Sequence, residues 1–268
     1  MKVIFYFTFL VLVLSSCSEY SRVLKGDDYT KKFSLANDLY ERKKYMNSIA
    51  LYEQVYQRLP KTAEGEVSFY RIGKGYYLTG DYYMGAYFLG SFFDKYPLST
   101  KIEESFFLKT ICSVKNSPQQ SLDQQETEIA INDVQQFIYL FPNSSRIDTC
   151  NIIIDNLRLK LENKDFESIK LYSKTLNYKS AVTTAETFLN DYPTSRNKEE
   201  VIYIKIKNSY FLAKNSIDDK KKDRIDKTIE TYRTFAVQFP ESKHLKELET
   251  LNKSLQQQLD DLKNKSLF

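Results

Sequence analysis

Residues 69–97 read FYRIGKGYYLTGDYYMGAYFLGSFFDKYP, and this stretch decides the fold of the chain. Two segments rich in aromatic residues flank a Thr-Gly-Asp turn, and a proline closes the second segment. Gly73 lies inside the first segment and Gly85 inside the second, although a glycine within a helix costs about 1 kcal/mol. Glycines at such positions indicate a packing requirement, so we expect Gly73 and Gly85 to mark the crossing of two antiparallel helices.

Prolines divide the rest of the chain into units of the same kind. Five of the six prolines follow a segment of helical character and precede, by two residues, a serine or threonine. Because proline disfavours helix continuation and a hydroxyl can cap the next helix, each mark predicts a boundary between two helical pairs. These prolines are Pro60, Pro97, Pro142, Pro193 and Pro240, and the intervals between them run from 37 to 51 residues. A period of this length is typical of a helical-pair solenoid.

The expected fold is therefore all-α. The pattern in residues 69–97 resembles the tetratricopeptide repeat (TPR), which places small residues where its two helices cross. We expect a TPR-like solenoid of about five repeats over residues 31–268, with repeats ending near residues 60, 97, 142, 193 and 240. The chain holds only 7 glycines and 6 prolines in 268 residues, which excludes β-sandwiches, barrels and doubly wound α/β folds, since these need many tight turns.

Other segments add detail to this solenoid. Residues 146–172 predict an extended first helix in the fourth repeat, and residues 116–125 and 215–224 predict surface loops. The lysine run 220–222 in the second loop is interpreted as solvated, or alternatively as a contact for anionic lipid or an acidic partner. Residues 244–263 place leucines on one face of a polar helix, which we interpret as a cap that closes the solenoid, or alternatively as a docking helix.

The amino terminus, MKVIFYFTFLVLVLSSC, has the pattern of a targeting signal followed by a membrane anchor. Its apolar run, residues 3–14, is too short to span a bilayer, which needs about 20 residues. The sequence Leu14-Ser15-Ser16-Cys17 resembles a bacterial lipoprotein signal, so we expect a signal peptide at residues 1–16, acyl chains such as palmitate on Cys17, and an anchor and linker at residues 17–30. By resemblance to Gram-negative lipoproteins, serine rather than aspartate at position 18 favours the outer membrane. The alternative is a chance cysteine after an ordinary secretory signal or short anchor.

We find no motif for catalysis, for a metal or for a cofactor in the sequence. The chain has one histidine and three cysteines, and no dinucleotide-binding, nucleophile-elbow, zinc-protease or phosphate-loop motif. We therefore expect a protein that is not an enzyme and holds no cofactor or metal. Its net charge of +4 is too small to indicate binding to nucleic acid. Cys112 and Cys150 are interpreted as small buried residues, with a disulfide as the alternative, and His244 as a surface or capping residue.

Because no catalytic, metal or cofactor motif is present in the sequence, we expect the protein to act by binding other molecules on its surface. A stack of helical pairs presents a groove, and repeat proteins bind extended peptides or partner domains there. Aromatic rings beside an amide and an ammonium group would suit a short chain with apolar side chains and a free carboxylate. The alternative is that some of these rings only pack between repeats. On the TPR pattern the groove positions are Phe33, Asn37 and Tyr40 in the first repeat, and Tyr70, Lys74 and Tyr77 in the second.

The order of these features resembles the BamD family, the TPR lipoprotein subunit of the outer-membrane β-barrel assembly machinery (the BAM complex). The resemblance rests on the cysteine at position 17, the repeated (Tyr/Phe)-Pro-x-Ser marks, the long helix at residues 146–172 and the closing helix. It implies a non-catalytic subunit, held by acyl chains at the periplasmic face of the outer membrane. It also implies that the carboxy-terminal repeats bind the periplasmic domain of a membrane-embedded, BamA-like insertase. The amino-terminal groove would receive the carboxy-terminal strand signal of unfolded barrel proteins, and accessory lipoproteins are further expected partners.

Two other classes of function share the same features. One is a different TPR lipoprotein scaffold that coordinates cell-wall or other envelope proteins. The other is a nutrient-binding surface lipoprotein with a helical-repeat core, against which the absence of tryptophan counts, because tryptophan commonly stacks on sugars.

Overall fold

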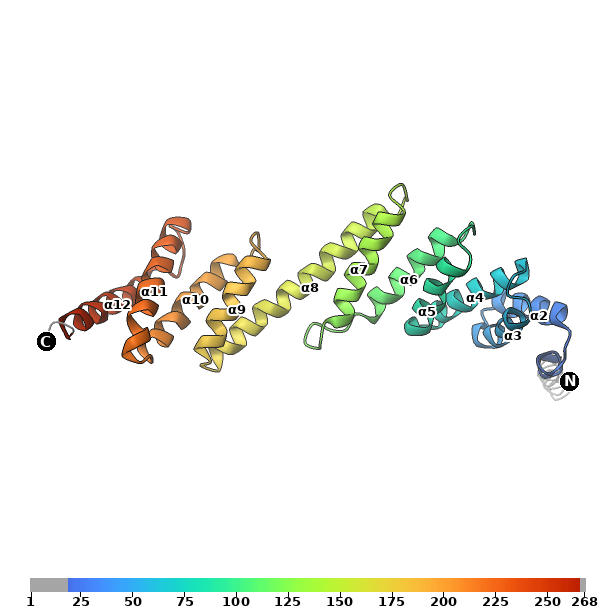
Figure 1. Ribbon diagram of the computed structural model, residues 1–268, viewed down its shortest axis with the longest axis horizontal. Helices are drawn as coiled ribbons and strands as arrows, with labels where there is room; N and C mark the ends of the chain where they lie inside the picture. The colour runs from blue at the N-terminus through green and yellow to red at the C-terminus, as the bar shows by residue number, and fades with distance from the viewer. Residues whose placement is uncertain (1–18, 266–268) are drawn as a thin grey trace, which may run out of the picture. The chain divides into compact units, whose positions relative to one another are not determined.

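The computed structural model describes residues 19–265, and every regular element in that range is an α-helix (Figure 1). The signal peptide and Cys17 expected from the sequence lie outside the described residues. After a helical segment at residues 19–25, the helices are α2 (Tyr29–Glu41), α3 (Tyr45–Arg58), α4 (Ala63–Thr79), α5 (Tyr82–Lys95), α6 (Ile102–Asn116), α7 (Gln125–Leu140), α8 (Ile147–Lys174), α9 (Tyr178–Asp191), α10 (Lys198–Lys214), α11 (Asp218–Gln238) and α12 (Leu245–Lys265).

The chain forms two compact units that divide between Leu157 and Arg158, inside α8. In the first unit, consecutive helices from α2 to α7 pack against one another. In the second, α9 packs on α10, α10 on α11, and α12 on both α10 and α11. The predicted all-α fold of stacked, TPR-like helical pairs is therefore confirmed.

Each pair ends in the same way. The second helices α3, α5, α7, α9 and α11 all end two residues before a proline, because the pyrrolidine ring cannot continue the helix. The residue between helix and proline donates its backbone N–H to the carbonyl four residues earlier. These residues are Leu59, Tyr96, Phe141, Tyr192 and Phe239.

The hydroxyl groups after the prolines do more than the predicted capping. Thr62 does cap α4, since its Oγ1 accepts a hydrogen bond of 3.2 Å from Gly65 N. Ser99 instead accepts from Lys101 N at 3.0 Å, and α6 begins without a side-chain cap. Its Oγ donates to Glu66 Oε1 at 2.6 Å, which ties the turn back to α4 of the preceding pair. The same bond joins Ser144 to Glu103 (2.7 Å) and Ser195 to Glu162 (2.6 Å).

The glycines mark a helix crossing, as predicted. A Cβ atom on Gly73 would lie 2.8 Å from Leu89 Cγ, so α4 and α5 can approach this closely only without a side chain there. A Cβ atom on Gly85 would lie 2.9 Å from Cys112 Sγ and 3.2 Å from the backbone nitrogen of Tyr77. Between the two helices, Gly80 adopts a left-handed φ of 83°, a conformation that glycine takes without strain.

Helix α8 is the long helix predicted at residues 146–172, and it contributes to the core of both units. In the first unit, Cys150 and Ile154 pack with Phe106 and Phe137. In the second unit, Ile169 packs with residues of α9 and α10. Cys112 and Cys150 are both free and buried, in different core clusters, which agrees with the interpretation as small buried residues.

One prediction near the carboxy-terminal end was wrong. The lysine run 220–222 lies in the first turns of α11 rather than in a loop, and Lys222 pairs with Asp226 at 2.9 Å. His244, predicted as a surface or capping residue, lies in the capping position before α12, where its carbonyl accepts a hydrogen bond of 3.0 Å from Leu248 N, and its side chain is 12% exposed. Its ring stacks on Tyr203 with 3.8 Å between centroids, and its Nε2 lies 2.9 Å from Glu200 Oε2.

The closing helix α12 packs its leucine face against its own unit. Leu248 and Leu255 are buried, and Leu251, Leu259 and Leu262 are packed around them. This burial favours the interpretation of α12 as a cap over that of a docking helix. Within residues 19–265, no helix is both long enough and apolar enough to span a bilayer.

Candidate functional site

A cleft of about 360 Å³ opens in the first unit, where the predicted groove was expected. Helix α4 supplies one side of it with residues spaced three and four apart, a spacing that brings them onto one helix face. The end of α2, one ring from α5 and the residue before α6 complete the wall. The lining residues are Tyr40, Glu41, Glu66, Val67, Tyr70, Arg71, Lys74, Phe92 and Lys101.

Three of the six predicted groove residues, Tyr40, Tyr70 and Lys74, line this cleft. The other three lie elsewhere in the same unit. Phe33 packs against the core cluster that contains Leu39 and Tyr52. Tyr77 packs with Tyr82 against the cluster that contains Phe92. These two rings serve packing between helices, which is the alternative that the sequence left open.

Asn37 does not line the cleft, but it orients Arg71, a lining residue that the sequence prediction missed. Its Oδ1 accepts hydrogen bonds from Arg71 Nη1 (3.0 Å) and from the Tyr52 hydroxyl (2.6 Å). The guanidinium of Arg71 also receives support from Glu41 Oε1 at 3.1 Å and lies 4.7 Å from the centroid of the Tyr40 ring. Arg71 is therefore held in place by neighbours on α2 and α3.

A second charged group stands beside this arginine. Lys74 Nζ donates to Glu104 Oε1 at 2.7 Å, and Lys101 Nζ lies 3.5 Å from the other oxygen of the same carboxylate. Burial opposes ionisation of Glu104, but the hydrogen bond from Lys74 and the attraction of both ammonium groups outweigh it and lower its pKa to about 2. Glu104 is thus charged at neutral pH, and it holds Lys74 at the wall of the cleft.

Two tyrosine hydroxyls at the cleft are buried. The Tyr40 hydroxyl oxygen has no hydrogen-bond partner among the described residues, whereas the Tyr70 hydroxyl lies beside the Glu104 carboxylate and helps to lower its pKa. Burial raises the pKa of both phenols well above the ordinary value, so both remain neutral donors at physiological pH. The cleft therefore combines aromatic surface, hydrogen-bonding capacity and cations that are each paired with a carboxylate.

The sequence held a signal for the missed residues. Val67, Tyr70, Arg71 and Lys74 follow the i, i+3, i+4, i+7 spacing of a single helix face. Tyr77, seven residues after Tyr70, continues that spacing, but it is occupied by contacts with the next helix.

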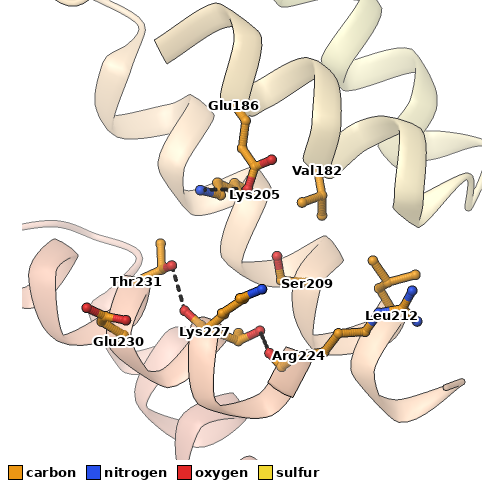
Figure 2. Close-up of a pocket in the computed structure, with 10 residues that line it drawn as sticks. Val182, Glu186, Lys205, Ser209, Leu212, Arg224, Lys227, Glu230 and Thr231 are labelled. Carbon is orange, nitrogen blue, oxygen red and sulfur yellow. Dashed lines mark hydrogen bonds and ion pairs between the residues drawn. The ribbon is translucent and has the colours of Figure 1, made fainter. Parts of the chain in front are cut away.

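The second unit has a cleft of its own, of about 240 Å³, between α9, α10 and α11 (Figure 2). Val182 and Leu212 give it apolar walls, and Lys205 points across it to Glu186, with 3.1 Å between Nζ and Oε1. Arg224 and Lys227 approach from α11. The lining is thus more cationic than anionic, with three basic side chains against Glu186 and Glu230.

The model of the YfiO family, described as an outer membrane lipoprotein, matches residues 26–183 and 159–264. The outer membrane protein assembly factor BamD of Caulobacter vibrioides is 19% identical over 171 residues, which cover 64% of this chain and 56% of the relative. The chain thus matches little more than half the length of that curated relative.

Solved structures of tetratricopeptide proteins were also found. A thermophilic TPR protein of Thermus thermophilus is 13% identical with a TM-score of 0.34. The TPR2AB domain of yeast Sti1, solved as a complex with pHSP90, is 12% identical with a TM-score of 0.39. Each match covers 85% of this chain and 98% of the other.

The family match carries the assignment, because its two segments together span nearly all of the described chain. It agrees with the stacked helical pairs and with the resemblance to BamD that the proline marks and the long helix predicted. The chain belongs to the YfiO family of outer membrane lipoproteins, the family of BamD-like proteins.

Proposed function

We propose that the protein is a non-catalytic, lipid-anchored scaffold that helps to insert β-barrel proteins into the outer membrane from its periplasmic face. The family match over residues 26–264 carries this proposal, and the name of the Caulobacter relative, an assembly factor, supports it. Acyl chains on Cys17 would hold the domain at the membrane. An anchor of this kind raises the local concentration of the scaffold, so weak recognition of substrates suffices.

The cleft of the first unit is the proposed site for the carboxy-terminal segment of an unfolded barrel protein. The rings of Tyr40 and Tyr70 would pack against an apolar or aromatic side chain of that segment. Its carboxylate would compete with Glu41 for Arg71. Glu41 has a side chain that is 71% exposed, so the exchange of one carboxylate for another costs little.

The second unit is the proposed site for the periplasmic domain of a BamA-like insertase. The basic lining of the cleft between α9 and α11 supports an acidic or polar segment of that domain as the contact. Accessory lipoproteins of the same complex are further proposed partners.

Depletion tests the function as a whole. We expect loss of the protein to lower the amount of folded barrel proteins in the outer membrane, while soluble periplasmic proteins persist. Unchanged barrel levels would rule out a role in assembly. Purification of the mature protein in detergent should bring an insertase with it, whereas cell-wall enzymes in its place would indicate a different scaffold.

A matched pair of variants tests the substrate site. Val67 lines the cleft and is 39% exposed, and Leu78 lies in the same helix, 42% exposed, outside the cleft. Val67→Arg fills the cleft with a long charged side chain, so we expect a peptide from the last strand of a barrel protein to bind at least tenfold more weakly, a loss of about 1.4 kcal/mol. Leu78→Arg should bind as the unmodified protein does. Equal binding by both variants would exclude this cleft.

A further inference from the structure

A group of exposed apolar side chains lies at one end of the first unit. Met46 on α3 is 58% exposed, and Tyr83, Met84 and Tyr87 on α5 are 63%, 37% and 65% exposed. We call these four residues the tyrosine edge. Consecutive helices run in opposite directions, so the turn between α2 and α3 and the turn between α4 and α5 lie at the same end of the stack. Tyr83 and Tyr87 are four residues apart and therefore share one face of α5, and two exposed aromatic side chains on one face favour a partner surface there.

Basic residues adjoin the tyrosine edge. The turn before Met46 contains Arg42, Lys43 and Lys44, all exposed. Arg42 pairs with Asp38 at 2.9 Å, whereas Lys43 and Lys44 have no ion pair among the described residues. The acidic groups nearby are engaged within the protein.

These acidic groups each have a structural role. Asp81, in the turn before α5, accepts a hydrogen bond from Met84 N at 3.2 Å and so caps that helix. Glu41 pairs with Arg71 on the side of the cleft. Asp81 keeps its negative charge, so the two lysines outnumber the one carboxylate at this end that has no cationic partner.

The start of the described chain lies at the same end. The Tyr20 hydroxyl donates to the carbonyl of Asn47, the neighbour of Met46, at 3.4 Å. Val23 and Leu24 pack against the core cluster of α2 and α3, so residues 19–25 are a docked helix rather than a free linker. Cys17 is two residues before Glu19 and can lie no farther from it than about 7 Å. Acyl chains on Cys17 would therefore enter a membrane beside the tyrosine edge.

We propose that the tyrosine edge is a membrane contact, in which the rings of Tyr83 and Tyr87 enter the interfacial layer and Lys43 and Lys44 meet anionic lipid headgroups. Tyrosine favours this layer because its ring is apolar and its hydroxyl stays hydrated. Lysines close to a negatively charged leaflet add electrostatic attraction to it. The inference rests on the acyl anchor of the proposed function and goes beyond it, since it fixes which end of the domain meets the bilayer.

A fluorescence experiment tests the contact, because the chain contains no tryptophan. The acylated protein carrying Tyr87→Trp would be reconstituted into vesicles of phosphatidylcholine and phosphatidylglycerol, with and without lipids brominated on their acyl chains. Brominated lipid should quench the new tryptophan roughly twofold if it reaches the interfacial layer. The matched control is Tyr139→Trp, at a site 83% exposed at the opposite end of the unit, which brominated lipid should leave unchanged.

The charge contribution is measured without the anchor. In the mature chain, which begins at residue 17, carrying Cys17→Ser, the further change Lys44→Gln should lower partition onto the same vesicles about fivefold. Lys61→Gln, in an exposed turn at the opposite end, should have no effect.

The outcomes separate this inference from the rest of the proposed function. If the acylated protein floats with the vesicles but the tryptophan at position 87 is quenched no more than that at position 139, the edge is covered by something other than lipid and the inference is wrong. If the protein does not float, the anchor and the inference fail together. Neither result bears on barrel assembly, which the depletion experiment measures separately.

Discussion

Replacing Gly73 with alanine sets two opposing effects against each other. Alanine is the better helix former, and in the interior of a helix this exchange ordinarily stabilises by about 1 kcal/mol. At Gly73, however, the new Cβ would lie 2.8 Å from Leu89 Cγ and 3.1 Å from the backbone nitrogen of Leu89, which is fully buried. Overpacking of this kind costs about 1–3 kcal/mol, so we expect Gly73→Ala to lose about 0–2 kcal/mol net.

Gly90 provides the matched control, since it lies in α5 with space around it. A Cβ atom there would meet only the side chain of Lys109, at 3.5 Å from Cγ and 3.9 Å from Cε, which are ordinary contacts, so Gly90→Ala should gain about 1 kcal/mol. Urea unfolding followed by circular dichroism at 222 nm would measure a difference of about 1–3 kcal/mol between the two variants. Leu89→Ala should cost at least about 0.5 kcal/mol less in the Gly73→Ala background than alone, because it removes the clashing atoms. Equal stability of Gly73→Ala and Gly90→Ala would refute the close crossing of α4 and α5.

Three further predictions concern side chains of both units. Tyr52→Phe should destabilise by about 1 kcal/mol, since it removes the hydrogen bonds of the hydroxyl with Asn37 and Arg71 but leaves those two bonded to each other, whereas Tyr40→Phe, which removes a hydroxyl without a protein partner, should be nearly neutral in the same urea titration. Because the pKa of Glu104 is lowered from 4.5 to about 2 in the folded state, its contribution is present above pH 4.5 and is lost as the pH falls toward 2. Glu104→Gln should therefore lower stability at pH 7 and weaken the loss of stability between pH 4.5 and 2 in acid titrations; an unaltered acid profile would contradict the ion pair. Ser195→Ala should cost about 1 kcal/mol through its bond to α8, and Thr194→Ala, in the same turn but exposed, should cost little in thermal unfolding.

The local features of the fold could be predicted because their causes are local. A proline ends a helix wherever it falls, and a glycine inside an aromatic-rich helix has few explanations other than a close approach. The hydrogen-bond partners of the serines after the prolines were harder to predict, because the partner of Ser99 is Glu66, 33 residues earlier in the chain. Only the stacked pair brings the two together, so a prediction from neighbouring residues gave capping alone.

The candidate cleft shows the same limit. Spacing along α4 placed Tyr70, Lys74 and Tyr77 on a common face, but which of them stays open depends on the neighbouring helices. Tyr77 is covered by its contact with Tyr82. Arg71 was missed because its role depends on three residues of α2 and α3.

For the lysine run in α11, the sequence did contain the decisive pattern. Lys222 and Asp226, and likewise Asp223 and Lys227, are four residues apart, and both pairs form ion contacts of 2.9 Å. Such spacing supports a helix. The density of charge in residues 215–224 favours a loop, but the spacing of opposite charges favours the helix that begins at Asp218.

The bonds from the turn serines to the preceding helix have a consequence for how sequences of this kind can change length. Glu66 and Ser99 are 33 residues apart, and so are Glu162 and Ser195, whereas Glu103 and Ser144 are 41 apart. Most of the additional residues lie in the longer connection, residues 117–124, at the far end of that pair, and the others in α7, which has 16 residues against 14 in α5. Insertions are thus accepted at the end of a pair that carries no such bond, while the bonded end keeps the register of the next pair. Evolution is free to remodel one border of the stack, and the other must stay constant.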